Sequence, residues 1–152
     1  MRQILVLVGL IVACLAVGGL GGWVTVAAVA EWYPTLVKPT WSPPSWLFGP
    51  VWTVLYIMMA VAAWLVWRAG KAKTALSLFA LQLTFNCVWS FLFFGARSPG
   101  LALIDNVFMW LAILATIIAF QRKSSAAALL MVPYLAWVSF AAALNAAIWS
   151  LN

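Results

Sequence analysis

Apolar residues along this chain form five long stretches, and each is long enough for a membrane-spanning helix. Such a helix needs about 20 apolar residues at a rise of about 1.5 Å per residue. Four of the stretches hold no charged residue, and the other holds Asp105 near its start. The pattern predicts helices over about 4–30, 46–67, 74–96, 101–121 and 125–150, with a loop over 31–45.

Composition supports a membrane protein and excludes other classes. Hydrophobic residues make up 68% of the 152 residues, whereas charged residues make up only 7%. A soluble domain carries about 25% charged residues, and a disordered chain combines low hydrophobicity with high charge. The chain is therefore predicted to be a single all-α transmembrane domain over 1–152, and its first stretch is interpreted as a retained helix.

The connections predict the topology of the bundle. Three of them are short, which places successive helices antiparallel in an up-down arrangement. The connection over residues 31–45 is longer, and it holds Pro34, Pro39, Pro43 and Pro44, which prevent a continuous helix. Because this loop is rich in Pro and Trp and nearly uncharged, we expect it to fold back over the bundle as a lid.

The basic residues lie between the apolar stretches, which is typical of membrane orientation and not of nucleic-acid binding. Lys38 and Arg97 fall on one side of the predicted bundle. The other six place the N-terminus in the cytoplasm of a bacterial inner membrane and the long loop outside. These six are Arg2, Arg68, Lys71, Lys73, Arg122 and Lys123.

Residue types that most catalytic sites need are scarce. The chain has no histidine and two acidic residues, Glu31 and Asp105. Cys14 and Cys87 lie in apolar stretches without a paired spacing, so we interpret them as packing residues. We expect no metal and no resident cofactor. Asp105 is interpreted as a carboxylate stabilised by a helix N-terminus, or as a partner of Arg97.

Two glycines in the first stretch, Gly18 and Gly22, have the spacing of a close helix contact. Small residues at this spacing let helix backbones approach each other. The contact could join two copies of the chain in a homodimer, or it could lie within one chain. The sequence leaves both alternatives open.

The eleven tryptophans divide into two groups. Trp64 and Trp67, just before Arg68, are typical of anchors at a membrane interface. Others lie too deep in their helices for that role. Helical spacing places the deep ones on shared faces: Trp52 with Tyr56 and Met59, then Gln82, Asn86, Trp89 and Phe93, then Tyr134, Trp137, Phe140, Ala141 and Asn145.

The amides on these faces have two interpretations. Within a bilayer, Gln82, Asn86 and Asn145 either hydrogen-bond neighbouring helices or face a cavity. A cavity with aromatic walls and few polar groups would suit a flat, apolar, conjugated ligand. Lys38 and Arg97, near its expected mouth, could meet acidic groups of such a ligand.

Residues 32–56 (WYPTLVKPTWSPPSWLFGPVWTVLY) resemble the signature of the TspO/MBR family. This family comprises the tryptophan-rich sensory proteins of bacteria and the mitochondrial translocator protein, or peripheral benzodiazepine receptor. Residues 82–95, 102–105 and 132–145 are similar to the family as well, in the same order. The resemblance touches every predicted helix except the first.

The resemblance implies a five-helix, often dimeric membrane bundle with a loop over a ligand cavity. It also implies binding of porphyrins such as protoporphyrin IX and haem, and of isoquinoline or benzodiazepine-like compounds. By resemblance, the cavity is lined by Trp52, Asn86, Trp89, Trp137 and Ala141, under a lid with Trp41 and Trp46. Tyr56, Tyr134 and Phe140 from the helix faces, and Trp32 and Lys38 from the loop, complete the candidate site.

Two departures from the family are visible. The fifth stretch lacks the Tyr and basic residue of the animal cholesterol motif, and Leu101 stands where animal members have Trp. We therefore predict a receptor or transporter-like protein that binds tetrapyrroles for sensing or translocation. The alternative is an enzyme that degrades protoporphyrin IX with light or oxygen through Trp52 and Trp137. A proton-coupled exporter is disfavoured, because no carboxylate lies in the middle of a stretch.

Overall fold

The computed structural model describes all residues 1–152, and five long helices make up most of it. Every one of them is long and apolar enough to cross a membrane. The prediction of an all-α bundle of five membrane-spanning helices is confirmed. The helices are α1 (Arg2–Glu31), α2 (Phe48–Arg68), α3 (Lys73–Ser90), α4 (Pro99–Gln121) and α5 (Ser125–Leu151).

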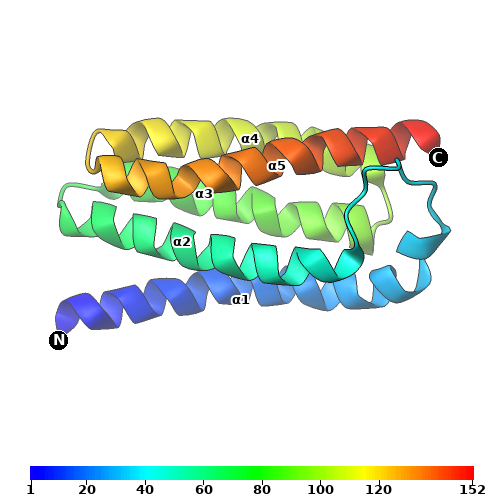
Figure 1. Cartoon of the computed structure of the whole chain (residues 1–152). Coiled ribbons are helices and arrows are strands. Elements are labelled where there is room, and N and C mark those ends of the chain that lie inside the picture. Colours follow the sequence, from blue (N-terminus) through cyan, green and yellow to red (C-terminus); the bar gives the residue numbers. More distant parts are fainter.

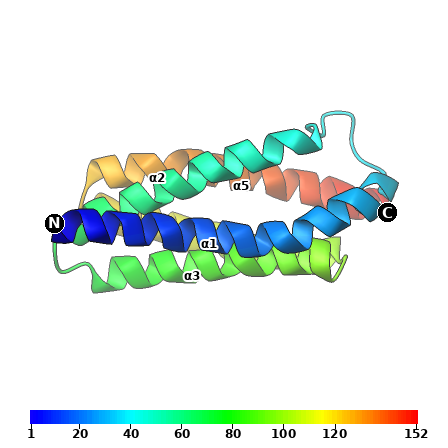
Figure 2. The ribbon, with the colours of Figure 1, turned by 90° about the horizontal axis from the view of Figure 1, so that it is seen from below.

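The helices run alternately in opposite directions (Figure 1). One end of the bundle carries the N-terminus and the α2–α3 and α4–α5 connections. The other end, called the loop end below, carries residues 32–47, the α3–α4 connection and the C-terminus. The α1 helix packs mainly against α2 and α3, and it crosses α2 at an angle (Figure 2). The six basic residues grouped by the sequence pattern all lie at the N-terminal end.

Local sequence explains where the later helices start. Pro99 occupies the first turn of α4, where its missing N–H would have no helical partner in any case. Ser124 caps α5, because its Oγ accepts a hydrogen bond from the backbone N–H of Ala127 at 3.2 Å. Between α3 and α4, the chain widens into a π-helical turn, Phe91–Gly95, closed by Ala96 N donating to Phe91 O at 2.7 Å.

Solid packing fills the half of the bundle nearest the N-terminus. Val66, Ile113 and Phe120 have no exposed surface or almost none, and Phe120 stacks on Phe79 with ring centroids 5.9 Å apart. Alanines at close contacts let the helix backbones approach one another. The buried alanines of this half include Ala60, Ala62, Ala63, Ala72, Ala75, Ala127 and Ala128.

The loop between α1 and α2 is ordered by specific contacts. It holds two short 3-10 turns, Tyr33–Thr35 and Ser45–Leu47. The Nζ of Lys38 donates to the carbonyl oxygens of Tyr33 at 2.8 Å and Leu36 at 2.9 Å. Asn152 exchanges two hydrogen bonds of 3.0 Å with the backbone of Val37. The loop is thereby attached to the end of α5, and the expectation that it folds back onto the bundle is confirmed.

Aromatic and basic side chains meet at the N-terminal end. The guanidinium of Arg68 lies 4.6 Å from the ring centroid of Trp64, and that of Arg2 lies 5.8 Å from Trp67. Trp64 also donates its indole N–H to the carbonyl of Gln3 at 2.9 Å. Cation–π pairs of this kind suit the membrane–water interface. The geometry agrees with the anchor interpretation of these two indoles.

Candidate functional site

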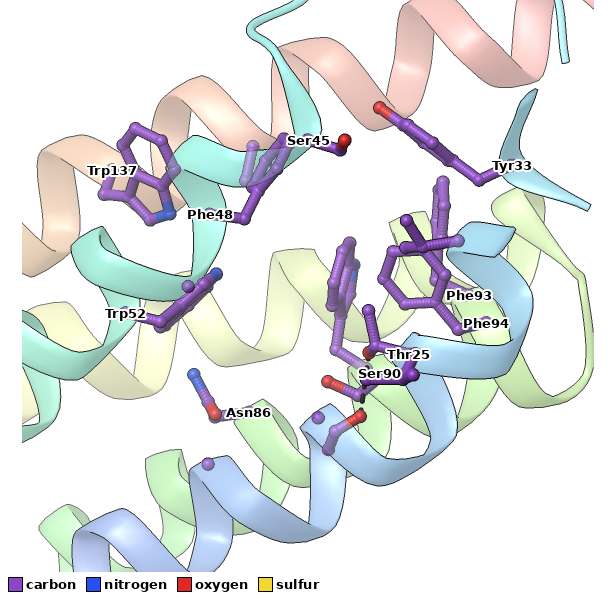
Figure 3. Close-up of a pocket in the computed structure, with 18 of the residues that line it drawn as sticks. Thr25, Tyr33, Ser45, Phe48, Trp52, Asn86, Ser90, Phe93, Phe94 and Trp137 are labelled. Atoms are coloured by element: carbon purple, nitrogen blue, oxygen red, sulfur yellow. Dashed lines mark hydrogen bonds between the residues drawn. The ribbon is translucent and has the colours of Figure 1, made fainter. Parts of the chain in front are cut away.

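A cavity of about 670 Å³ occupies the half of the bundle nearest the loop (Figure 3). Its volume falls within the range of about 300–1,000 Å³ that ligand cavities occupy. Residues of all five helices, the π turn and the loop contribute to its wall. Most of these residues are apolar, and the polar side chains among them are few: Thr25, Tyr33, Ser45, Thr53, Tyr56, Asn86, Ser90 and Asn145.

Three indoles give the cavity its aromatic walls. Trp52 comes from α2, Trp89 from α3 and Trp137 from α5. Trp137 meets Phe48 edge to face at 6.0 Å, and Trp89 stacks on Phe93 at 5.1 Å. Figure 3 shows the rings of Trp52, Trp137 and Phe48 on one side of the cavity and those of Phe93 and Phe94 on the other. Apolar π-faces are thus presented to the same space from opposite sides.

A chain of hydrogen bonds forms the floor of the cavity. Tyr56 donates its hydroxyl to Asn86 Oδ1, and Asn86 Nδ2 donates to the Tyr134 hydroxyl oxygen at 3.1 Å. Tyr134 in turn donates to Gln82 Oε1 at 2.8 Å. Gln82 therefore hydrogen-bonds a neighbouring helix, which is the first of the two interpretations of the amides. Asn86 joins helices and also lines the cavity.

A second pair of hydrogen bonds fixes the indole of Trp89. Its Nε1 donates to Asn145 Oδ1 at 3.2 Å, and Asn145 Nδ2 donates to the carbonyl of Pro99 at 2.7 Å. Asn145 is buried, so both of its polar groups are satisfied within the protein. The Trp89 ring is consequently held in one orientation across the α3–α5 contact.

Two other donors on the cavity wall have no partner. The indole N–H of Trp137 and the hydroxyl of Tyr33 are buried and make no hydrogen bond within the chain. Leaving such a group unsatisfied costs about 1–3 kcal/mol. A ligand with a suitably placed acceptor would recover part of this cost. The two groups come from different elements, α5 and the loop.

Most of the sequence-predicted ligand-binding residues lie at this wall, and two do not. Tyr134 is fully buried behind Asn86, within the hydrogen-bonded floor. Phe140 packs instead between Trp41 and Trp137, at 5.8 Å and 5.5 Å between ring centroids. The predicted residues that line the cavity are Trp52, Tyr56, Asn86, Trp89, Trp137 and Ala141.

The predicted lid residues lie outside the cavity wall. Trp32 packs edge to face on Phe93 at 5.7 Å, and Trp46 is 72% exposed. Trp41 reaches Phe140, and Lys38 is held by loop carbonyls and lies 4.8 Å from the Tyr33 ring centroid. From the loop, the wall takes Tyr33 and Ser45 instead.

The sequence interpretation missed the contribution of α1, which supplies nine residues between Leu15 and Ala30 to the wall. A Cβ at Gly18 would lie 2.5 Å from the Tyr56 ring, and one at Gly21 would lie 2.8 Å from Ser90 Oγ. Gly18 thus packs within the chain, whereas a Cβ at Gly22 would meet nothing within 4 Å. The run of glycines was the available signal, but it does not show which of them faces a void.

The expected roles of Asp105 are wrong. Arg97 lies 3.8 Å from the carboxylate of Glu31, so it does not pair with Asp105. The α4 helix starts at Pro99, which places Asp105 in the second turn, beyond the first turn where the helix dipole acts. Asp105 is buried, and its Oδ2 has no hydrogen-bond partner.

The sequence of this chain matches a known protein family over most of its length. The TspO/MBR family model matches residues 10–150. The chain is 48% identical to "Tryptophan-rich protein TspO" of Chlorobaculum tepidum, over 99% of this chain and 98% of that protein. It is 43% identical to "Translocator protein" of Homo sapiens, over 80% of this chain and 75% of that protein. It is 42% identical to "Tryptophan-rich sensory protein" of Cereibacter sphaeroides, over 80% of this chain and 77% of that protein.

The family match covers the aromatic loop, the helices that carry the three cavity indoles and the glycine-rich part of α1. This five-helix integral membrane protein, with its aromatic cavity under a folded loop, is therefore a member of the TspO/MBR family.

Proposed function

We propose that the cavity binds a tetrapyrrole such as protoporphyrin IX or haem, and that the protein senses or translocates this ligand. The observation that carries the proposal is the cavity of about 670 Å³ with the indoles of Trp52, Trp89 and Trp137 on its wall. Membership of a family whose members are named as sensory and translocator proteins supports the general kind of function.

The chemistry of the wall fits a flat conjugated ring. An aromatic pair in an offset or edge-to-face arrangement contributes about 0.5–1.5 kcal/mol beyond burial of area. The free N–H of Trp137 and the hydroxyl of Tyr33 provide donors for carboxylate or carbonyl oxygens of the ligand. Isoquinoline and benzodiazepine-like compounds combine flat rings with carbonyl acceptors, and we propose them as further ligands of the same site.

Binding is tested with a double variant, Trp52→Ala with Trp137→Ala, in detergent or nanodiscs. Titration of protoporphyrin IX, followed by its Soret absorbance, should show affinity at least about tenfold weaker, equivalent to about 1.4 kcal/mol. The matched control, Trp23→Ala with Trp149→Ala, removes two exposed indoles that do not line the cavity and should bind as the wild type does. Equal affinity of all three proteins would refute the site.

A second candidate function is degradation of bound protoporphyrin IX in the presence of light and oxygen. The placement of two oxidisable indoles, Trp52 and Trp137, on the wall favours it. In this case the illuminated complex should lose its Soret band faster than free porphyrin in the same detergent. Loss at the rate of free porphyrin, or equal loss in a Trp52→Phe and Trp137→Phe double variant, would contradict an enzymatic role.

We propose that the N-terminal end faces the cytoplasm of a bacterial inner membrane and that two copies associate. The six basic residues at that end support the orientation through the positive-inside rule. A single cysteine introduced at Lys71 or at Thr40, in a background without Cys14 and Cys87, should be labelled only from the cytoplasmic or only from the outer side, respectively.

Chemical cross-linking in native membranes tests the homodimer.

A further inference from the structure

The residues that line the cavity differ in exposure from one side to another. Lining residues from α3, the π turn, α4 and α5 are all buried or half-buried. Lining residues that are also exposed on the outside of the molecule come only from α1 and from residues 45–53. Examples are Gly19 and Val26 on α1, and Gly49 and Thr53 on α2. The same residues therefore border the cavity and the outer surface.

Glycines keep this side open. The α1 helix touches its neighbours closely at Gly18 and Gly21, where a Cβ would collide with Tyr56 and Ser90. At Gly19 and Gly49, which are exposed, a Cβ would meet no atom within 4 Å. The opening, called the α1–α2 window below, is framed by Gly19, Val26, Gly49 and Thr53.

Part of the α1–α2 window lies at the depth of the lipid acyl chains, while Gly49 stands next to the first residue of α2. Gly22, on the same stretch of α1, is nine residues from the end of the helix at Glu31, or about 14 Å at the helical rise. Thr53 is five residues from the start of α2, or about 8 Å. The hydrocarbon core is about 30 Å thick, so a helix position 8–14 Å from its end faces lipid.

At the loop end, where Ala30 and Ser45 are also exposed lining residues, several contacts hold the loop in place. Asn152 ties Val37 to the end of α5, and Lys38 holds two loop carbonyls. Trp41 packs on Phe140 of α5. A ligand that came through the loop would have to break these contacts, whereas the α1–α2 window needs none of them to break.

We infer that the cavity exchanges its ligand sideways with the bilayer, through the α1–α2 window and not through the loop. The inference rests on the proposed function, because it names the route of the same ligand. It also states the ligand class: a flat molecule dissolved in the hydrocarbon layer, which passes between two helices edge first. Gly19 and Gly49 serve here as residues that leave the passage free.

The test places bulk on the rim of the window. In proteoliposomes, the Gly19→Phe and Gly49→Phe double variant should bind and release protoporphyrin IX at least about tenfold more slowly than the wild type, as stopped-flow Trp quenching measures. A narrowed passage slows binding and release alike. A side chain that filled the cavity would instead weaken the affinity.

Two controls separate this route from the loop. Gly9→Phe adds the same bulk to α1 at a position with open space that does not line the cavity, and it should leave both rates unchanged. Asn152→Ala releases the loop from α5 and should leave both rates unchanged as well. Faster exchange in Asn152→Ala, or wild-type rates in the double variant, would overturn the inference and leave the binding function intact.

A measurement without porphyrin makes the window testable even if the proposed ligand is wrong. Absence of any protoporphyrin IX binding to the wild type would refute the proposed function. In vesicles of dibrominated phosphatidylcholine, brominated acyl chains that reach the window quench the fluorescence of Trp52. The part of the quenching that belongs to Trp52 is the difference between the protein with Trp52 and a Trp52→Phe variant. The double variant should lose at least about half of that share, because quenching needs close approach. Equal quenching with and without the added bulk would overturn the window.

Discussion

The two halves of the bundle use the same helices but different side chains. Near the N-terminus, alanines and aliphatic side chains let α2, α3, α4 and α5 pack closely on one another. Near the loop, indoles and glycines replace them, and a cavity of about 670 Å³ remains. Large rigid rings hold the helices apart, and glycines beside them provide no atoms to fill the space. In this bundle, the cavity lies where the largest and the smallest residues are combined.

The hydrogen-bonded floor separates the halves. Tyr56 and Asn86 face the cavity, while Tyr134 and Gln82 lie wholly within the packed half. Polar groups in a bilayer must find partners, and these four satisfy one another across α2, α3 and α5. The floor is thus a fixed boundary, and changes on either side of it should have different consequences.

The largest expected difference comes from truncating one aromatic ring in each half. Phe120→Ala should lower the free energy of unfolding by about 3–5 kcal/mol, because it leaves a hole among fully buried side chains. Phe48→Ala, beside the existing cavity, should lose less than about half of that. Unfolding in mixed micelles with increasing SDS measures both. Equal losses would show that the two halves are packed alike.

Adding volume should give the next largest difference. Ala63→Phe forces a ring into the packed half, where Ala63 has no exposed surface, and should cost about 1–3 kcal/mol or more. Ala141→Phe adds the same ring on the cavity wall and should leave the free energy of unfolding within about 0.5 kcal/mol of the wild type. Strong destabilisation by Ala141→Phe would mean that the space beside it is not available.

The floor itself is tested by removing one hydroxyl. Tyr134→Phe leaves Gln82 Oε1 and Asn86 Nδ2 each without its hydrogen bond to Tyr134 and should lower the free energy of unfolding by about 1 kcal/mol. Tyr33→Phe is the matched control, because the Tyr33 hydroxyl makes no hydrogen bond. It should leave stability unchanged in the ligand-free protein. Similar effects of the two variants would argue against a structural floor.

The smallest effect is expected at the loop. Asn152→Ala removes two exposed hydrogen bonds to Val37 and should change global stability by only about 0.5 kcal/mol. The amide of Val37 should nevertheless exchange its hydrogen faster, since its acceptor is gone. Hydrogen–deuterium exchange with mass spectrometry of the peptide over residues 33–41 measures this. Unaltered exchange would mean that other contacts hold the loop.

Hydropathy alone predicted the five spans, because every helix here must be apolar along its length to cross a bilayer. The rotation of each helix was harder to predict. Tyr134 and Trp137 are three residues apart and were placed on one face, yet only Trp137 reaches the cavity. Tyr134 lies nine residues from the start of α5, at a depth that belongs to the packed half. A shared face does not imply a shared depth.

Two other features depended on tertiary contacts that local patterns do not encode. Neighbouring glycines have opposite roles: Gly18 packs on Tyr56, while Gly19 faces open space. Arg97 meets Glu31, distant in sequence, because the end of α1 and the α3–α4 connection lie at the same end of the bundle. From sequence spacing alone, the acidic residue predicted to pair with Arg97 was its near neighbour, Asp105.

The central claim is that the void in the loop half is a binding site, and filling it tests the claim most directly. The measurement is the affinity of protoporphyrin IX for Ala141→Phe, with Leu129→Phe, 68% exposed to lipid, as control. We predict affinity at least about tenfold weaker for Ala141→Phe, with unfolding and the control unchanged. Wild-type affinity in a folded Ala141→Phe protein would contradict the account.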